Sequence, residues 1–263
     1  MRIGIIDSGV GGLTVLMALR QRVPASYIYM MDNKYLPYGE KTEAFIQQRL
    51  AQLSAYLIEC GAELIVIACN TATTQAVEFL RGKFTIPFVG VVPAIKPAAL
   101  LSQGKGFAVL ATPATVNGVY LQDLIQTFAA NGEKVLTFGS SELVRLAEEK
   151  IWYQHDVSAQ VADILSVSCL ASTPPAILVL GCTHFPFLAD EIRQAFAGEV
   201  LLLETSEAIA RRVEVLSAEN SDVVSEVQEN RFISTRELLP AQVERLKEFG
   251  FDQHSCWPKP LVS

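Results

Sequence analysis

The chain has 263 residues, of which 50% are hydrophobic and 19% charged, enough to bury a sizeable core in one large domain or two small ones. Its formal net charge of -7 argues against nucleic acid or an anionic membrane as the main partner. No apolar run is long enough to cross a membrane, and the five cysteines form no CxxC pair that would indicate zinc. We therefore expect a cytoplasmic protein with reduced thiols, no signal peptide and no metal.

Short runs rich in Ile, Val, Leu and Phe predict buried strands along most of the chain. They lie at Arg2–Asp7, Tyr27–Asp32, Leu64–Cys69, Pro87–Val92, Phe107–Ala111, Val135–Phe138, Ile177–Cys182 and Val200–Leu203. Stretches with helical periodicity separate them, at Thr42–Cys60, Thr73–Lys83, Val116–Ala130 and Ser158–Leu170. Apolar strands that alternate with amphipathic helices are typical of a parallel sheet covered on both faces, so the pattern predicts the α/β class.

Eight strands allow a single (β/α)8 barrel, but two features favour two smaller sheets. The segment "VVPAIKPAALLSQGKG" carries Pro93 and Pro97 and ends in a Gly-rich turn, which indicates a crossover between domains. The second half also repeats the first, because a strand ending in a cysteine occurs once in each. We expect one domain over residues 1–96 with 205–263, and a similar one over 97–204. After Leu203 a helix is expected, with Thr205 or Ser206 as N-cap, and the polar tail beyond it gives few indications.

The loop "DSGVGGLT" after the first strand only partly resembles a nucleotide-binding loop. Gly9 and Gly11 fit the dinucleotide fingerprint, but Thr14 stands where its last glycine belongs, and a P-loop lysine is absent. The glycines could instead let backbone N–H groups approach a small anionic ligand at a helix N-terminus. The simpler alternative is a tight strand-to-helix turn.

Polar side chains gather where predicted strands end. In open parallel sheets, ligands bind beyond the carboxyl ends of the strands. The residues at or just after such ends are Asp7, Ser8, Cys69, Asn70, Cys182, Thr183 and His184. A tight turn explains the glycines but not this concentration of polar groups.

The cysteines in "VIACNTAT" and "VLGCTHFP" share one arrangement. Each of Cys69 and Cys182 ends an apolar strand, is followed by hydrogen-bond donors, and is expected to precede a helix whose positive end favours a thiolate. One such cysteine is usually an inert small hydrophobe. Two thiols that act on one ligand suggest that one removes a proton from a carbon atom while the other returns a proton on the opposite face. A racemase needs this symmetry because it must accept both enantiomers.

The segments "DSGVGGLT", "DNKYLPYGEKT", "ACNTAT" and "LGCTHFP" resemble, in this order, the motifs of the glutamate racemase family. The resemblance implies cofactor-independent conversion of L-glutamate to D-glutamate for peptidoglycan, and hence for cell wall biogenesis and cell shape. It also implies two pseudo-symmetric α/β domains with the active site in the cleft between them. The family commonly forms dimers, which makes a homodimer an expectation. Family members that need a peptidoglycan-precursor activator carry an N-terminal extension, so no activator is expected here.

The resemblance also assigns residues to roles. The implied catalytic residues are Cys69, Cys182, Asp7, His184 and Glu148. The implied substrate contacts are Asp7, Ser8, Tyr38, Gly39, Asn70, Thr71, Thr115, Thr183 and His184. Cys182 would act on L-glutamate and Cys69 on D-glutamate. Asp32 is a further neighbour, and Glu149 competes with Glu148 for the supporting role.

Several alternatives stay open on the sequence. A racemase of aspartate or another amino acid would share the thiol pair, and a non-catalytic binder of a small anionic ligand would share the fold. A cysteine hydrolase would leave the second cysteine unexplained. Taken without the resemblance, Glu148 and Glu149 read as a solvated helix face, and Tyr38 with Gly39 as an ordinary turn. The other cysteines, Cys60, Cys169 and Cys256, are expected to have no chemical role.

Overall fold

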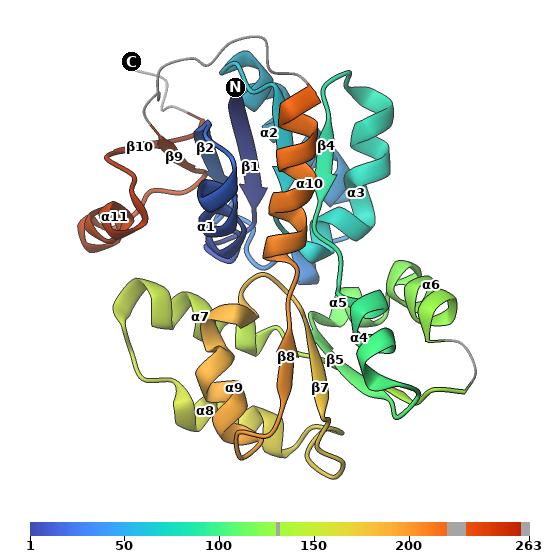
Figure 1. Cartoon of the computed structure of the whole chain (residues 1–263). Coiled ribbons are helices and arrows are strands. Elements are labelled where there is room, and N and C mark those ends of the chain that lie inside the picture. The colour runs from blue at the N-terminus through green and yellow to red at the C-terminus, as the bar shows by residue number, and fades with distance from the viewer. Residues whose placement is uncertain (130–131, 220–229, 259–263) are drawn as a thin grey trace. The chain divides into compact units, whose positions relative to one another are not determined.

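The computed structural model describes residues 1–129, 132–219 and 230–258, and these form two compact units (Figure 1). The first unit comprises Met1–Val91 and Ser206–Ser263, and the second comprises Val92–Thr205. The first junction falls at Val91, whereas the sequence-based division lies after residue 96. Within the described ranges, no helix is long and apolar enough to span a membrane.

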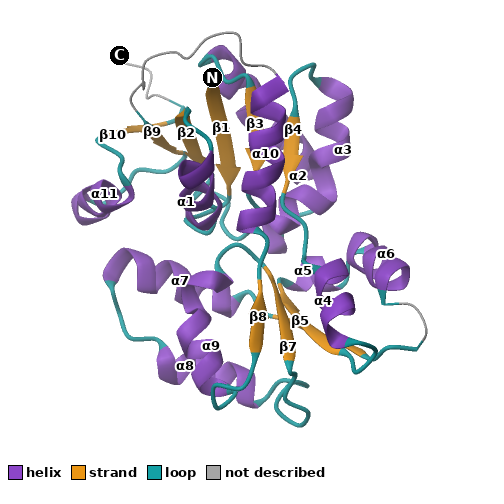
Figure 2. Ribbon diagram, in the orientation of Figure 1, coloured by secondary structure: helices purple, strands orange, loops and turns teal. Residues whose placement is uncertain are grey.

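The first unit is built on a sheet with the strand order β10-β9-β2-β1-β3-β4 and only parallel pairs between described strands. The strands are β1 (Arg2–Asp7), β2 (Ser26–Met31), β3 (Leu64–Ile67), β4 (Phe88–Gly90), β9 (Arg231–Ser234) and β10 (Gln253–Cys256). The helices are α1 (Leu13–Arg22), η1 (Tyr38–Glu40), α2 (Glu43–Glu59), α3 (Asn70–Lys83), α10 (Ser206–Glu219), α11 (Pro240–Leu246) and η3 (Lys247–Phe249). Helices α1 and α10 pack together on one face of the sheet, and α2 and α3 cover the other (Figures 1 and 2).

The second unit has a smaller sheet with the order β6-β5-β7-β8, again with parallel pairs. Its strands are β5 (Phe107–Ala111), β6 (Val135–Gly139), β7 (Ile177–Gly181) and β8 (Leu201–Leu203). Its helices are α4 (Ile95–Ser102), α5 (Pro113–Val116), α6 (Val119–Phe128), α7 (Glu142–Tyr153), α8 (Ser158–Ser166), η2 (Phe185–Leu188) and α9 (Ala189–Ala195). Helices α4 and α6 lie on one face of this sheet, and α7, α8 and α9 lie on the other (Figure 2).

The two sheets share a topological core. In the first unit the order β2-β1-β3-β4 places the first strand between the second and third, and β6-β5-β7-β8 has the same pattern. Strand β3 of the first unit therefore corresponds to β7 of the second. This confirms the α/β class with two similar parallel sheets and excludes the (β/α)8 alternative.

The structure differs from the sequence analysis in two places. The polar tail contains β9 and β10, which extend the first sheet beyond β2. The helix expected at Val116–Ala130 is present as α6 but begins only at Val119, after Gly118, whose backbone is extended (φ -77°, ψ 143°). Residue 130 lies outside the described residues.

Candidate active site

Cys69 and Cys182 occupy corresponding places in the two units. Cys69 follows β3, which pairs with β1, and Cys182 follows β7, which pairs with β5. Both side chains are buried, with relative exposures of 8% and 7%, and neither forms a disulfide. Each thiol therefore lies at the carboxyl edge of its own sheet, beside the central strand.

Cys69 is the N-cap residue of α3. Its backbone is extended (φ -141°, ψ 119°), and its carbonyl oxygen accepts a hydrogen bond of 2.8 Å from Thr73 N. The unpaired N–H groups at a helix N-terminus carry partial positive charge, which favours a thiolate over a thiol. The helix expected after Cys69 is present, although it begins three residues earlier than the pattern indicated.

The loop after β1 packs against the residue that precedes Cys69. A Cβ atom at Gly12 would lie 2.9 Å from Ala68 Cβ and 2.8 Å from the Tyr29 hydroxyl, so only glycine allows this close approach. Asp7 is fully buried, and its Oδ1 accepts hydrogen bonds from Gly9 N at 2.9 Å and Ser8 Oγ at 3.3 Å. Asp7 and Ser8 thus lie at the same sheet edge as Cys69.

The first turn of α3 presents two buried polar side chains, Asn70 and Thr71. Asn70 Oδ1 has no hydrogen-bond partner among the described residues. A buried acceptor without a donor is destabilising by about 1–3 kcal/mol, so such atoms in native proteins call for a physical cause. A ligand that donates a hydrogen bond to Asn70 Oδ1 would explain why this oxygen lacks a partner among the described residues.

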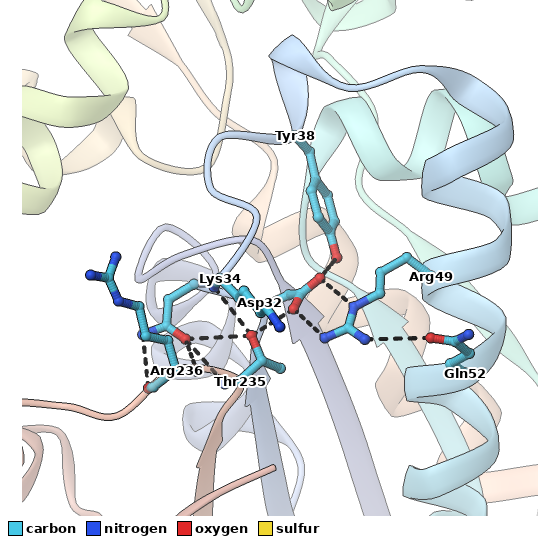
Figure 3. A network of polar contacts seen from close by, with 8 residues as sticks. Asp32, Lys34, Tyr38, Arg49, Gln52, Thr235 and Arg236 are labelled. Carbon is cyan, nitrogen blue, oxygen red and sulfur yellow. Dashed lines mark hydrogen bonds and ion pairs between the residues drawn. The ribbon is translucent and has the colours of Figure 1, made fainter. Parts of the chain in front are cut away.

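Asp32 is fully buried and accepts hydrogen bonds from three side chains (Figure 3). Arg49 holds both carboxylate oxygens, with Nη2–Oδ1 at 2.7 Å and Nε–Oδ2 at 2.9 Å. The Tyr38 hydroxyl donates to Oδ2 at 2.7 Å, and Thr235 Oγ1 donates to Oδ1 at 2.6 Å. Because these donors occupy both oxygens, Asp32 is suited to holding Tyr38 in place rather than to accepting a substrate proton.

Tyr38 connects this network to Cys69. Both side chains belong to one hydrophobic cluster between the sheet and helices α2 and α3. Burial raises the pKa of Tyr38 well above its ordinary value, and the negative charges of Asp32 and Cys69 raise it further. Tyr38 is therefore a neutral hydrogen-bond donor at physiological pH. Gly39 follows it in η1, which supports the turn that the sequence suggested.

Cys182 lies in different surroundings, and one expectation about it was wrong. The segment after it forms the short 3-10 helix η2, and α9 begins only at Ala189, so no α-helix N-terminus lies at Cys182. Pro186 lies in the first turn of η2, where its missing N–H removes no helical hydrogen bond. The group beside this thiol is an imidazole and not a helix N-terminus: His184 Nδ1 lies 3.8 Å from Cys182 Sγ.

His184 links Cys182 to a carboxylate on α7. Its Nε2 lies 2.7 Å from Glu148 Oε1, and the imidazole is almost fully buried. Burial alone would lower the pKa of His184, but the hydrogen bonds and charges of Cys182 and Glu148 outweigh it and raise the pKa well above 6.5. The protonated imidazolium form of His184 is therefore favoured, and it places a positive charge beside the Cys182 sulfur.

The structure distinguishes the two glutamates that the sequence left open. Glu148 contacts His184, whereas Glu149, which is only partly buried, pairs with His155 at 2.8 Å. The solvated helix face is thus the right description of Glu149 and the wrong one for Glu148. Periodicity alone does not reveal this, because both residues lie near the boundary of the apolar face of α7.

Two buried threonines lie at the same sheet edge as Cys182. Thr183 follows Cys182 directly and is buried. Thr115 lies in α5, just after β5, where its Oγ1 is 3.0 Å from Thr112 Oγ1. Since β5 pairs with β7, Thr115 lies at the same sheet edge as Cys182.

Sequence reasoning missed three residues that donate hydrogen bonds to buried carboxylates. Arg49 and Thr235 donate to Asp32, and Trp152 donates to Glu148. No motif marks them, and Thr235 lies in the tail that gave few indications. The remaining cysteines, Cys60, Cys169 and Cys256, are free and take no part in the contacts above. No group of ligating side chains suited to a metal ion occurs in the described part of the chain.

A comparison with protein families matches residues 3–213 to the Asp/Glu/Hydantoin racemase family. A glutamate racemase of Shewanella woodyi is 44% identical over 95% of this chain and 96% of its own. One of Shewanella loihica is 49% identical over 80% of this chain and 78% of its own.

Among solved structures, glutamate racemases also match this chain. The glutamate racemase of Escherichia coli, in complex with L-glutamate and the activator UDP-MurNAc-Ala, has a TM-score of 0.88 and 38% identity and covers 96% of both chains. That of Francisella tularensis, with D-glutamate, has a TM-score of 0.78 and 28% identity over 97% of this chain and 96% of its own. That the present chain needs no activator stays a prediction.

Proposed function

Because the chain belongs to the Asp/Glu/Hydantoin racemase family and is an isomerase of the glutamate racemase type, we propose that it racemises glutamate by two-base proton transfer at the α-carbon, without a cofactor. Cys69 and Cys182 are the two acid/bases. One observation carries this proposal: the two thiols follow corresponding strands of two sheets with the same strand order, and each has its own means of stabilising a thiolate.

In the L-to-D direction, the Cys182 thiolate takes the α-proton of L-glutamate. The electron pair of the broken C–H bond stays on the α-carbon and delocalises into the carboxylate. The Cys69 thiol then donates its proton to the opposite face, which yields D-glutamate and leaves Cys69 as the thiolate. The reverse reaction, or proton exchange with solvent, resets the enzyme. The substrate must therefore contact both thiols during one turnover.

Two different devices support the two thiols. His184, held by Glu148, stabilises the Cys182 thiolate through its positive charge. The N-terminus of α3 does so for Cys69, where Asp7 relays a proton or holds the substrate ammonium group. The asymmetry is consistent with each thiol acting on a different enantiomer.

The α-proton of an amino acid is weakly acidic, so the site must stabilise negative charge that develops on the carboxylate. Ser8, Thr71 and Thr183 supply hydroxyl donors, and the Asn70 amide supplies N–H groups. The unpartnered Asn70 Oδ1 accepts a hydrogen bond from the substrate ammonium group. Thr115, Tyr38 and Gly39 are further substrate contacts in this proposal.

We further propose that the D-glutamate is used for peptidoglycan and hence for cell wall biogenesis and cell shape, which places the enzyme in the cytoplasm with its precursors. A homodimer is the proposed assembly. Glutamate is the proposed preference over aspartate, because the relatives are glutamate racemases.

Substitution of each cysteine tests the mechanism. Racemisation of L- and D-glutamate is followed by circular dichroism in Cys69→Ala, Cys182→Ala and, as a control, Cys169→Ala, whose side chain is exposed and lies outside both clusters. Removal of an acid/base lowers rates by about 10²–10⁴-fold, so each of the first two variants should lose at least a hundredfold in both directions. The control should keep the parent rate. If either variant retains racemisation near the parent rate, the two-thiol mechanism is wrong.

A further inference from the structure

Trp152 contacts the carboxylate that holds His184. It lies one helical turn after Glu148 on α7, and its Nε1 donates a hydrogen bond of 2.8 Å to Glu148 Oε2. The other oxygen, Oε1, is the one that contacts His184 Nε2 at 2.7 Å. The indole is buried, with a relative exposure of 8%. The two oxygens of one carboxylate thus have separate partners.

This arrangement fixes the orientation of the imidazole. A carboxylate only accepts hydrogen bonds, so the proton between Glu148 and His184 lies on Nε2. Nδ1 is then the atom that faces Cys182 Sγ, at 3.8 Å. The indole N–H holds the Glu148 carboxylate in the rotamer that aims Oε1 at His184, and it stabilises the negative charge there.

We propose that Trp152 is a positioning residue for the Cys182 half of the reaction: through Glu148 it keeps His184 aligned and charged beside the thiol. The inference rests on the proposed function, in which Cys182 is an acid/base. Trp152 itself touches neither the thiol nor the imidazole in any contact described above, so it acts through the carboxylate.

One other charged group of α7 has its partners elsewhere. Lys150, also on α7, donates to the Phe187 carbonyl at 2.8 Å and pairs with Glu191 of α9 at 2.6 Å. Cys182, from the end of β7, and Glu148 are the ionisable groups that set the charge of His184. A change at Trp152 should therefore be felt at His184 through Glu148.

The test replaces Trp152 by Phe, which keeps a buried aromatic ring and removes the N–H donor. Trp152→Tyr is a second replacement in case the first fails to fold. The matched control is Ile151→Val, which trims a buried side chain of the same helix and removes no side-chain hydrogen bond. The chain has three histidines, so the imidazole of His184 can be followed by NMR titration and assigned with a His184→Gln variant.

Without the indole donor, Glu148 holds the imidazolium less firmly. The pKa of His184 should fall by about 1 unit, a tenfold change in its protonation equilibrium, and the same ionisation should move in the pH profile of kcat/KM. We expect kcat/KM at neutral pH to fall roughly tenfold. In a Glu148→Gln background, Trp152→Phe should add no further loss, because its route of action is already removed.

Three results would overturn the inference. The first is an unchanged pKa of His184 in Trp152→Phe. The others are a loss of kcat/KM that adds fully to the loss in Glu148→Gln, and an effect of Ile151→Val on the pKa and on kcat/KM as large as that of Trp152→Phe. The titration does not depend on turnover, so it separates this inference from the proposed function. If Cys182→Ala still racemises glutamate, the two-thiol mechanism fails even where the titration shifts as expected.

Discussion

Replacement of Arg49 by Met should destabilise the first unit strongly. Arg49 is the cation that neutralises Asp32, which is fully buried, and it contacts both carboxylate oxygens. Removing one partner of a buried ion pair costs about 3–5 kcal/mol, because it leaves an uncompensated charge. Since Tyr38 and Thr235 still donate to Asp32, we expect the lower end of this range. The guanidinium also stacks on Trp257, 5.2 Å from the ring centre, and this contact is lost too.

Tryptophan fluorescence can follow this unit alone. The chain has two tryptophans, Trp152 in the second unit and Trp257 in the first. In a Trp152→Phe background, urea unfolding monitored at Trp257 reports the first unit. With a slope of about 2 kcal/mol per M urea, a loss of ~3 kcal/mol lowers the midpoint by roughly 1.5 M.

A control variant and a double variant test whether the loss of stability comes from the buried charge of Asp32. Lys247→Met removes an exposed ion pair with Glu244 in the same unit and should leave the midpoint where it was. Asp32→Asn combined with Arg49→Met should cost less than the sum of the two single changes, because the buried charge is then gone. A midpoint for Arg49→Met equal to that of the parent would refute the idea that Arg49 neutralises Asp32.

Three further outcomes follow from the two clusters. Glu148→Gln should lower the pKa of His184 and reduce kcat/KM by about 10–100-fold, whereas Glu149→Gln should do neither; NMR titration and circular dichroism kinetics measure both. Because the pKa of His184 is raised in the folded protein, its stabilising contribution is fully present below about pH 6.5 and is lost as the pH rises through the folded value. Above pH 6.5, the urea midpoint measured from the fluorescence of Trp152 should therefore change less with pH in His184→Gln than in the parent. Asn70→Ala should raise KM for glutamate and leave the unfolding midpoint unchanged or higher, since its Oδ1 has no partner to lose among the described residues.

Much of the fold could be predicted because its strands are buried on both faces. Continuous apolar runs such as Leu64–Ile67 are typical of strands in a parallel sheet that helices cover on both sides, and the strand ends then place Cys69 and Cys182 at sheet edges. Because the two sheets share a strand order, the two similar cysteine segments follow corresponding strands. The non-catalytic alternative loses its support, because the relatives at high coverage are racemases.

Contacts between distant segments could not be predicted. Thr235 reaches Asp32 only because β9 pairs with β2, and the polar sequence of the tail gives no sign of that pairing. Whether Glu148 or Glu149 contacts His184 depends on which side of α7 faces η2. The two residues are adjacent in the helix, so the sequence pattern would have to place that side to within one residue. From the strand-end pattern alone, a helix is expected directly after Cys182, whereas these residues form the 3-10 helix η2 with Pro186 in its first turn.

The fate of the α-proton tests the central claim most directly. The enzyme converts L-glutamate in deuterated water to low conversion, the two enantiomers are separated on a chiral column, and proton NMR of each fraction measures deuterium at the α-carbon. Two thiols predict that nearly every D-glutamate carries deuterium from Cys69, while unreacted L-glutamate keeps its proton. A D-glutamate product that retains the original α-proton would show that one group both removes and returns it, and would contradict the two-thiol account.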